Sequence, residues 1–291
     1  MTTDPIDAEA FALQVERFYA RLVSASVTER RVPPVSILRP GIRAPDSTSN
    51  QNPEPSLGGK LFYAGELDAE ARAFVVAANV AGAATLAVSA SAVACKQAMR
   101  DGVVDFLVTT LDEALRILKN ELRKRETVAV CVSQAPQTIE REMRERGVLP
   151  DLKRPIEPAE LESNQAILTW RTASAPSLWL PKIDAIVHDC LQQNLGQQKL
   201  GHQKLGQQNM GAPGLDFEIW ESARRWLRLS PRYLGRLAQG VRVLRSSEST
   251  ADSILKRVRE AVECGEIGAA ITVRRICPAR VEQFTLESSH S

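Results

Sequence analysis

Between residues 58 and 152, short apolar runs alternate with longer segments whose apolar positions recur with the period of a helix. The expected strands cover residues 60–64, 85–89, 105–109 and 127–133, and the expected helices cover 67–82, 91–100, 111–125 and 137–146. Short strands separated by long helices indicate a parallel sheet, because parallel neighbours need a crossover. The strands are apolar almost throughout, as in a sheet buried on both faces. We therefore predict an α/β fold with a doubly wound, mostly parallel, Rossmann-like sheet.

The segments on both sides of this stretch predict an N-terminal helix and a C-terminal α/β extension. In residues 1–57, apolar positions from Phe11 to Leu22 share one helical face, which we expect to pack on the main body or on a partner. The Pro-rich and polar residues that follow predict a structureless linker. Residues 153–194 continue the α/β pattern with a strand at 166–171 and a helix at 177–190.

Residues 195–215 form a low-complexity Gln/Gly insert with a glycine at every fifth position. Glycine at this frequency opposes a helix, so the insert is expected to be disordered. Residues 216–281 then predict a C-terminal α/β segment, with amphipathic helices near Trp226 and over 253–263 and a strand at 269–276. Residues 282–291 are expected to be a frayed tail.

Composition narrows the classes of function. A net charge of +2 and a pI of about 8.3 argue against a dominant electrostatic partner such as bulk nucleic acid. The five cysteines form no CxxC pair, so neither a zinc site nor a disulfide framework is indicated, and Cys131 is interpreted as a core residue. We expect a cytoplasmic protein, since the sequence contains neither an apolar run long enough for a membrane span nor a signal peptide.

The segment from Trp220 to Arg245 mixes tryptophan, tyrosine and arginine, as nucleic-acid surfaces do. Aromatic residues three or four positions apart are more often core residues, however, and arginines between them more often face water. We favour this structural interpretation and keep nucleic-acid or regulatory binding through residues 220–245 as an alternative.

Four short matches within the central stretch keep their order and spacing over about 95 residues: GKL at 59–61 with Gly65, AANVAGA at 77–83, LDEAL at 111–115 and RGVLPD at 146–151. Together they resemble the NAD-binding, Rossmann-like domain of urocanase (urocanate hydratase). The resemblance implies NAD as a cofactor and the addition of water to urocanate as the activity.

Three departures from the family pattern weaken that implication. The family's glycine-rich turn is replaced by GELDAEA at 65–71, where Glu66, Asp68 and Glu70 would repel a pyrophosphate; a well-charged first helical turn explains these acids better. After Asp151 the family's Thr/Ser-rich segment is replaced by LKRP. No stretch resembles the His-His-Gly-Gly segment of the family's catalytic core, and the chain contains 3 histidines in all.

The function that fits these observations is a non-catalytic, urocanase-related module that binds a small molecule or a protein partner. No cofactor, metal or membrane is expected, no catalytic residue is assigned, and a homo-oligomer stays open. A ligand is expected at the carboxyl ends of the strands, near Gly65, Ser89, Thr109, Thr110 and Ser133. The alternatives are a urocanate hydratase-type NAD-dependent lyase and the nucleic-acid or regulatory binder described above.

Overall fold

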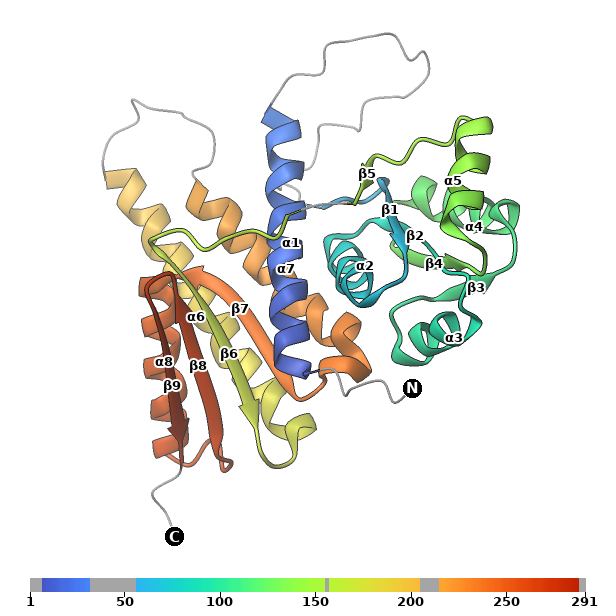
Figure 1. Cartoon of the computed structure of the whole chain (residues 1–291). Coiled ribbons are helices and arrows are strands. Elements are labelled where there is room, and N and C mark those ends of the chain that lie inside the picture. Colours follow the sequence, from blue (N-terminus) through green and yellow to red (C-terminus); the bar gives the residue numbers. More distant parts are fainter. Residues whose placement is uncertain (1–6, 32–55, 155–156, 205–214, 288–291) are drawn as a thin grey trace.

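The computed structural model describes residues 7–31, 56–154, 157–204 and 215–287. The central stretch forms a five-stranded sheet in the order β3-β4-β2-β1-β5, with every neighbouring pair parallel (Figure 1). Its strands are β1 (Leu61–Glu66), β2 (Ala84–Val88), β3 (Phe106–Val108), β4 (Val128–Val132) and the short β5 (Leu152–Lys153). The predicted Rossmann-like, mostly parallel sheet is confirmed.

Helices cover both faces of this sheet: α2 (Ala69–Ala81), α3 (Ala92–Asp101), α4 (Leu111–Lys124) and α5 (Pro136–Glu145). Alternate side chains of β1 divide between two hydrophobic cores. Phe62 lies in the core that contains α2 and α3, whereas Tyr63 lies in the core that contains α4 and α5. Strands β2 and β4 are neighbours, yet the helices that follow them, α3 and α5, lie on opposite faces. The topological switch point therefore lies between β2 and β4.

The C-terminal extension contains a second, antiparallel sheet in the order β7-β6-β8-β9. Its elements are β6 (Gln165–Thr172), α6 (Pro176–Lys204), α7 (Leu215–Ala238), β7 (Val241–Ser247), α8 (Glu248–Glu263), β8 (Ile271–Cys277) and β9 (Arg280–Leu286). Two successive arginines of β8 show how its faces are covered. Arg274 pairs with Glu9 of the N-terminal helix at 2.6 Å, whereas Arg275 pairs with Asp252 of α8 at 2.5 Å on the opposite face.

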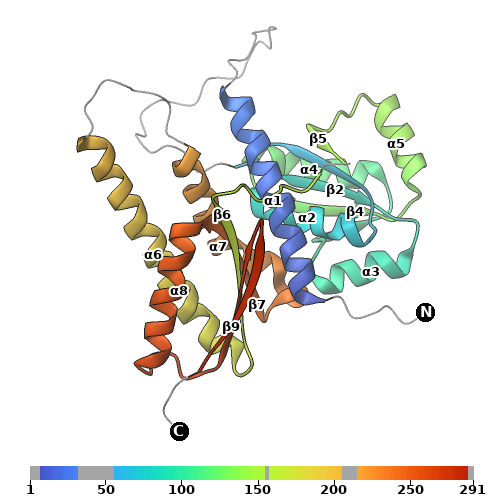
Figure 2. The same ribbon diagram turned by 60° about the vertical axis from the view of Figure 1, so that its left-hand side comes forward.

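Helix α1 (Ala8–Arg31) packs between the two sheets (Figure 2). Phe18 stacks on Phe74 of α2 with ring centroids 3.6 Å apart. On the other side, the Tyr19 hydroxyl donates to the carbonyl oxygen of Ser222 in α7 at 2.9 Å. The buried residues of α1, α2, α7 and the second sheet form one continuous core. The N-terminal helix therefore lies against the main body, where it joins the two sheets.

Two expectations for the extension are wrong. The chain does not fray from Glu282, because β9 pairs with β8 as far as Leu286. Helix α6 runs to Lys204, so the first half of the Gln/Gly insert is helical: once the buried first turns have nucleated the helix, each further residue adds a backbone hydrogen bond despite its low propensity. The second half of the insert and the linker after α1 lie outside the described residues.

None of the described helices is long and apolar enough to cross a bilayer. All five cysteines are free, and Cys264 is the exposed one. Cys131, the predicted core residue, is fully buried, with its Sγ 3.7 Å from that of Cys95. Burial and the neighbouring Cys95 raise the pKa of the Cys131 thiol far above its ordinary value, so it stays protonated.

We therefore expect one fast-reacting thiol per chain in a titration of the native protein with Ellman's reagent, with the other four reacting after denaturation. The Cys264→Ser variant should lose the fast phase. Two or more fast thiols in the native protein would contradict this burial pattern.

Candidate functional site

The carboxyl ends of the parallel strands bring the predicted site residues to one edge of the sheet. Gly65 lies one residue before the end of β1, Ser89 follows β2, Thr109 and Thr110 follow β3, and Ser133 follows β4. Ligands of doubly wound sheets bind outside this edge at the switch point, which lies here between the loops that begin at Ser89 and Ser133. The edge is therefore the first place to look for a site.

Most of the hydroxyl groups at this edge already have structural partners. Ser89 is fully buried; its hydroxyl donates to Glu66 Oε1 at 2.6 Å and accepts the Ser91 backbone N–H at 3.2 Å. Thr110 caps α4 by accepting the Glu113 N–H at 3.3 Å, and Glu113 in turn accepts the Thr109 N–H at 3.1 Å. These hydrogen bonds, with that of the Thr109 N–H the largest contribution, hold the pKa of Glu113 below its ordinary value.

Ser133 differs from the other hydroxyl residues. Its backbone N–H donates to the Val108 carbonyl at 2.9 Å, but its hydroxyl makes no hydrogen bond with any residue that the structure describes. Gln134, the next residue, donates from its side-chain amide to the Thr109 carbonyl oxygen at 2.6 Å. Ser133 is thus the predicted site residue whose side chain is available to a ligand.

The turn between β1 and α2 is where the dinucleotide pyrophosphate of a Rossmann fold approaches the helix N-terminus. Here Asp68 occupies that position as the N-cap of α2, with its Oδ1 accepting the Ala71 N–H at 2.6 Å. Gly65 supplies the turn's left-handed backbone, with φ of +71°. A carboxylate of the chain itself therefore satisfies the helix N-terminus.

Arg154 closes the same turn from the end of β5. Its guanidinium donates to the carbonyl oxygens of Ala64 and Glu66 at 3.3 Å and to the carboxylates of Asp68 at 3.2 Å and Glu70 at 2.7 Å. We call Arg154, Asp68, Glu70 and these two carbonyl groups the Arg154 cluster. Its arginine also lies 5.4 Å from the centroid of the Phe74 ring. The carboxylates of Asp68 and Glu70 are thus held by a residue about 85 positions away, a contact that was not predicted.

Two further observations on this sheet concern the ionisation of Tyr63, in the middle of β1, and possible metal ligands. Burial, with the nearby Glu140 carboxylate, raises the pKa of the Tyr63 phenol, whose hydroxyl donates to Glu140 at 3.2 Å. Tyr63 therefore stays a hydrogen-bond donor. Among the described residues, no group of three or more His, Cys, Asp or Glu side chains is placed to hold a metal ion. His188 lies on α6, away from this sheet.

Several tryptophan and arginine side chains of residues 220–245 make contacts within the fold. Trp226 is 1% exposed, and its indole N–H donates to the Val243 carbonyl oxygen. Arg225 donates to the Val80 carbonyl at the end of α2 at 2.9 Å. Arg242 and Arg245 form ion pairs with Asp184 and Glu16 at 2.9 and 2.8 Å. These residues therefore have structural roles.

The central part of the chain matches a known protein family. Residues 46–155 match the family model described as the urocanase Rossmann-like domain. The match confirms the resemblance found in the sequence and covers the whole parallel sheet from β1 to β5, including Arg154. Helix α1 and the second sheet lie outside the matched residues.

Proposed function

We propose that this chain is a non-catalytic binding protein in which a urocanase-type Rossmann-like unit has kept its fold and lost its dinucleotide site. The observation that carries this proposal is the occupied N-terminus of α2. A pyrophosphate would have to displace Asp68 from the Ala71 N–H and break up the Arg154 cluster. It would also meet the Glu66 carboxylate, and each close like-charge contact costs about 1 kcal/mol or more in a partly exposed cleft. The residues of this turn do not fit NAD.

A small molecule is the ligand we infer for the switch point itself. The free hydroxyl of Ser133 and the outward-facing Glu66 carboxylate support a neutral or cationic polar ligand there, because both groups accept hydrogen bonds. The five free cysteines support a reducing, cytosolic compartment for such a protein.

Calorimetric titration tests the loss of the dinucleotide site. We expect NAD to show no dissociation constant below about 1 mM, which corresponds to roughly 4 kcal/mol of binding free energy. The Asp68→Ser variant, which keeps a helix cap while removing one carboxylate, serves as the matched control and should also fail to bind, because Glu70 and Arg154 still close the turn. A micromolar constant for the wild-type chain would contradict the proposal.

A further inference from the structure

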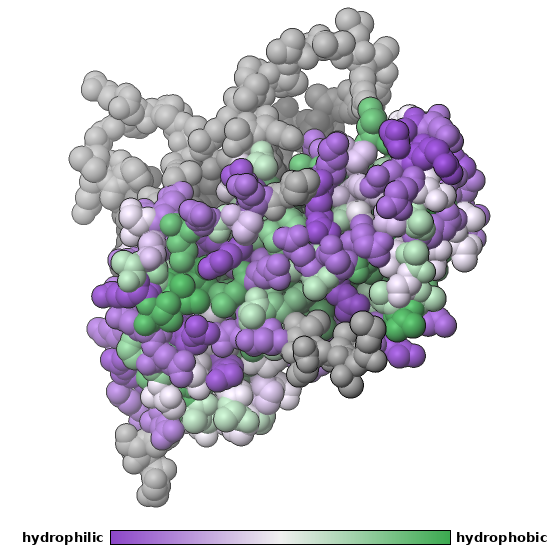
Figure 3. Space-filling view, viewed as in Figure 1, coloured by the Kyte–Doolittle hydropathy of each residue, from purple (hydrophilic) through white to green (hydrophobic). Residues whose placement is uncertain are grey.

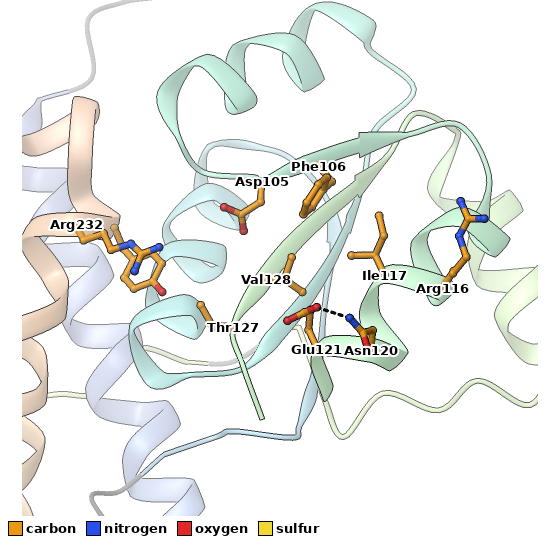
Figure 4. A pocket seen from close by; sticks show the side chains of 10 residues that line it. Asp105, Phe106, Arg116, Ile117, Asn120, Glu121, Thr127, Val128 and Arg232 are labelled. Carbon is orange, nitrogen blue, oxygen red and sulfur yellow. Dashed lines mark hydrogen bonds between the residues drawn. The ribbon is translucent and has the colours of Figure 1, made fainter. Parts of the chain in front are cut away.

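A groove lies at the edge of the parallel sheet opposite to the one that the fold favours for ligands. It has a volume of about 970 Å³ and lies where β3 and β4 begin, between α4 and the C-terminal half of α7 (Figure 4). Its lining residues are Asp105, Phe106, Arg116, Ile117, Asn120, Glu121, Thr127, Val128, Arg232 and Tyr233. The groove is therefore lined by elements of the parallel sheet and by α7 of the C-terminal extension.

The middle of the groove is apolar because the edge strand is incompletely covered. Phe106 of β3 is 47% exposed, although its partner in the adjacent strand, Val130, is fully buried. Parallel sheets are normally covered on both faces, and here α4 leaves the outermost strand open. Phe106, Val128 and the partly buried Ile117 give the groove an apolar floor (Figure 4).

The two ends of the groove carry arginines. Figure 4 shows Arg232 at one end and Arg116 at the other. Arg232 lies 5.4 Å from the centroid of the Tyr233 ring, and neither arginine forms an ion pair with any described residue. The Glu121 carboxylate, in contrast, is neutralised by Lys124 at 3.1 Å. Two exposed cations thus face one carboxylate without an ion-pair partner, Asp105, whose oxygen accepts the Ala129 N–H at 2.8 Å.

We propose that this groove binds an acidic peptide segment of a protein partner, with an apolar side chain over Phe106 and carboxylates at Arg116 and Arg232. Charge complementarity favours an acidic occupant. The outer side of β3 has no neighbouring strand in the described sheet, so an extended peptide can also pair with the strand's backbone. A second copy on this face would bring Arg116 of one chain towards Arg232 of the other, which is repulsive. The groove is separate from the turn that excludes NAD, so the two proposals stand or fall independently.

A random dodecapeptide library displayed on phage, panned against the full-length chain, tests this site. We expect the enriched peptides to carry acidic residues on both sides of an apolar residue. Fluorescence anisotropy with the most enriched peptide should show binding that weakens about 10-fold or more in the Arg116→Glu/Arg232→Glu variant, which corresponds to about 1.4 kcal/mol. The matched control, Arg141→Glu/Arg257→Glu, reverses two exposed charges outside the groove and should bind as the wild type does.

Several results would overturn the proposal. One is that acidic peptides are enriched no more on the wild-type chain than on the Arg116→Glu/Arg232→Glu protein. Another is that basic peptides are enriched instead. A third is that the control variant loses as much affinity for the peptide as the Arg116→Glu/Arg232→Glu variant does. Competition by millimolar glutarate that is as strong as competition by unlabelled peptide would show a site for small anions instead. Slower hydrogen exchange of the amides at residues 105–109 on peptide binding would support backbone pairing with β3.

Discussion

Replacing Arg245 by alanine is expected to destabilise the fold by about 3–5 kcal/mol, because it leaves a buried carboxylate without its counter-ion. The side chain of Glu16 on α1 is 3% exposed, and its Oε1 lies 2.8 Å from Nε of Arg245 on β7. The guanidinium also donates to the carbonyl oxygen of Glu160 at 2.8 Å and to Gln165 at 3.2 Å. Thermal unfolding should show a melting temperature lower by about 6 °C or more.

An exposed ion pair on α8 provides the control for this prediction. Arg257 and Glu260 lie 3.2 Å apart with side chains 56% and 44% exposed, so Arg257→Ala should change the stability by less than about 0.5 kcal/mol. The Glu16→Met/Arg245→Met double variant should lose less than the sum of the two single variants, since no uncompensated charge stays buried. A loss below about 1 kcal/mol for Arg245→Ala would show that Glu16 is compensated in another way.

The arginines within β7 explain why this strand was not predicted from the sequence. The segment VRVLRSS alternates apolar and polar residues less regularly than a half-buried strand, and Arg245 stands where a strand buried by α1 would be expected to carry an apolar residue. Its partner Glu16 is 229 positions away. A local pattern cannot show that a distant carboxylate makes an arginine suitable for the interior. Strands β2 and β4 of the parallel sheet, in contrast, were predictable because their burial requires apolar residues only, whereas the two-residue β5 was not predicted.

The candidate site shows the same division between local and distant information. The interpretation of the acidic turn as a charged first turn of α2 is correct for Glu70 and for Asp68, which caps the helix through residues within three positions of it, but not for Glu66, which ends β1. Arg154 belongs to the LKRP segment that departs from the family pattern. Its contacts with Asp68 and Glu70 could not be predicted from the sequence, because they depend on β5 lying next to β1. The groove at Phe106 depends likewise on α7 reaching the beginning of β3.

The purified chain is expected to convert no detectable urocanate, with or without added NAD, when loss of the ultraviolet absorbance of urocanate is followed. Hydration in the family uses NAD as an electrophile together with acid–base groups, and electrophilic and acid–base contributions each account for orders of magnitude in rate. In this chain Asp68 caps the N-terminus of α2 and Arg154 bonds to Glu70, and on these contacts we base the proposal that NAD does not bind. The raised pKa of Tyr63 keeps that phenol protonated, so it cannot serve as a base.

Two variants decide how any detected turnover of urocanate would be interpreted. A turnover above about 0.01 per second, roughly a hundredth of the lower end of ordinary enzyme rates, would contradict the non-catalytic function if Ser133→Ala and Glu140→Gln both abolished it. These two replacements remove the free hydroxyl that follows β4 and the hydrogen-bond partner of Tyr63. The matched control Ser253→Ala alters a hydroxyl on α8, outside the Rossmann-like unit, and must leave such a turnover unchanged. Activity that survives all three variants would have to come from the Glu66 carboxylate at this edge or from a contaminating enzyme, and a Glu66→Gln variant distinguishes the two.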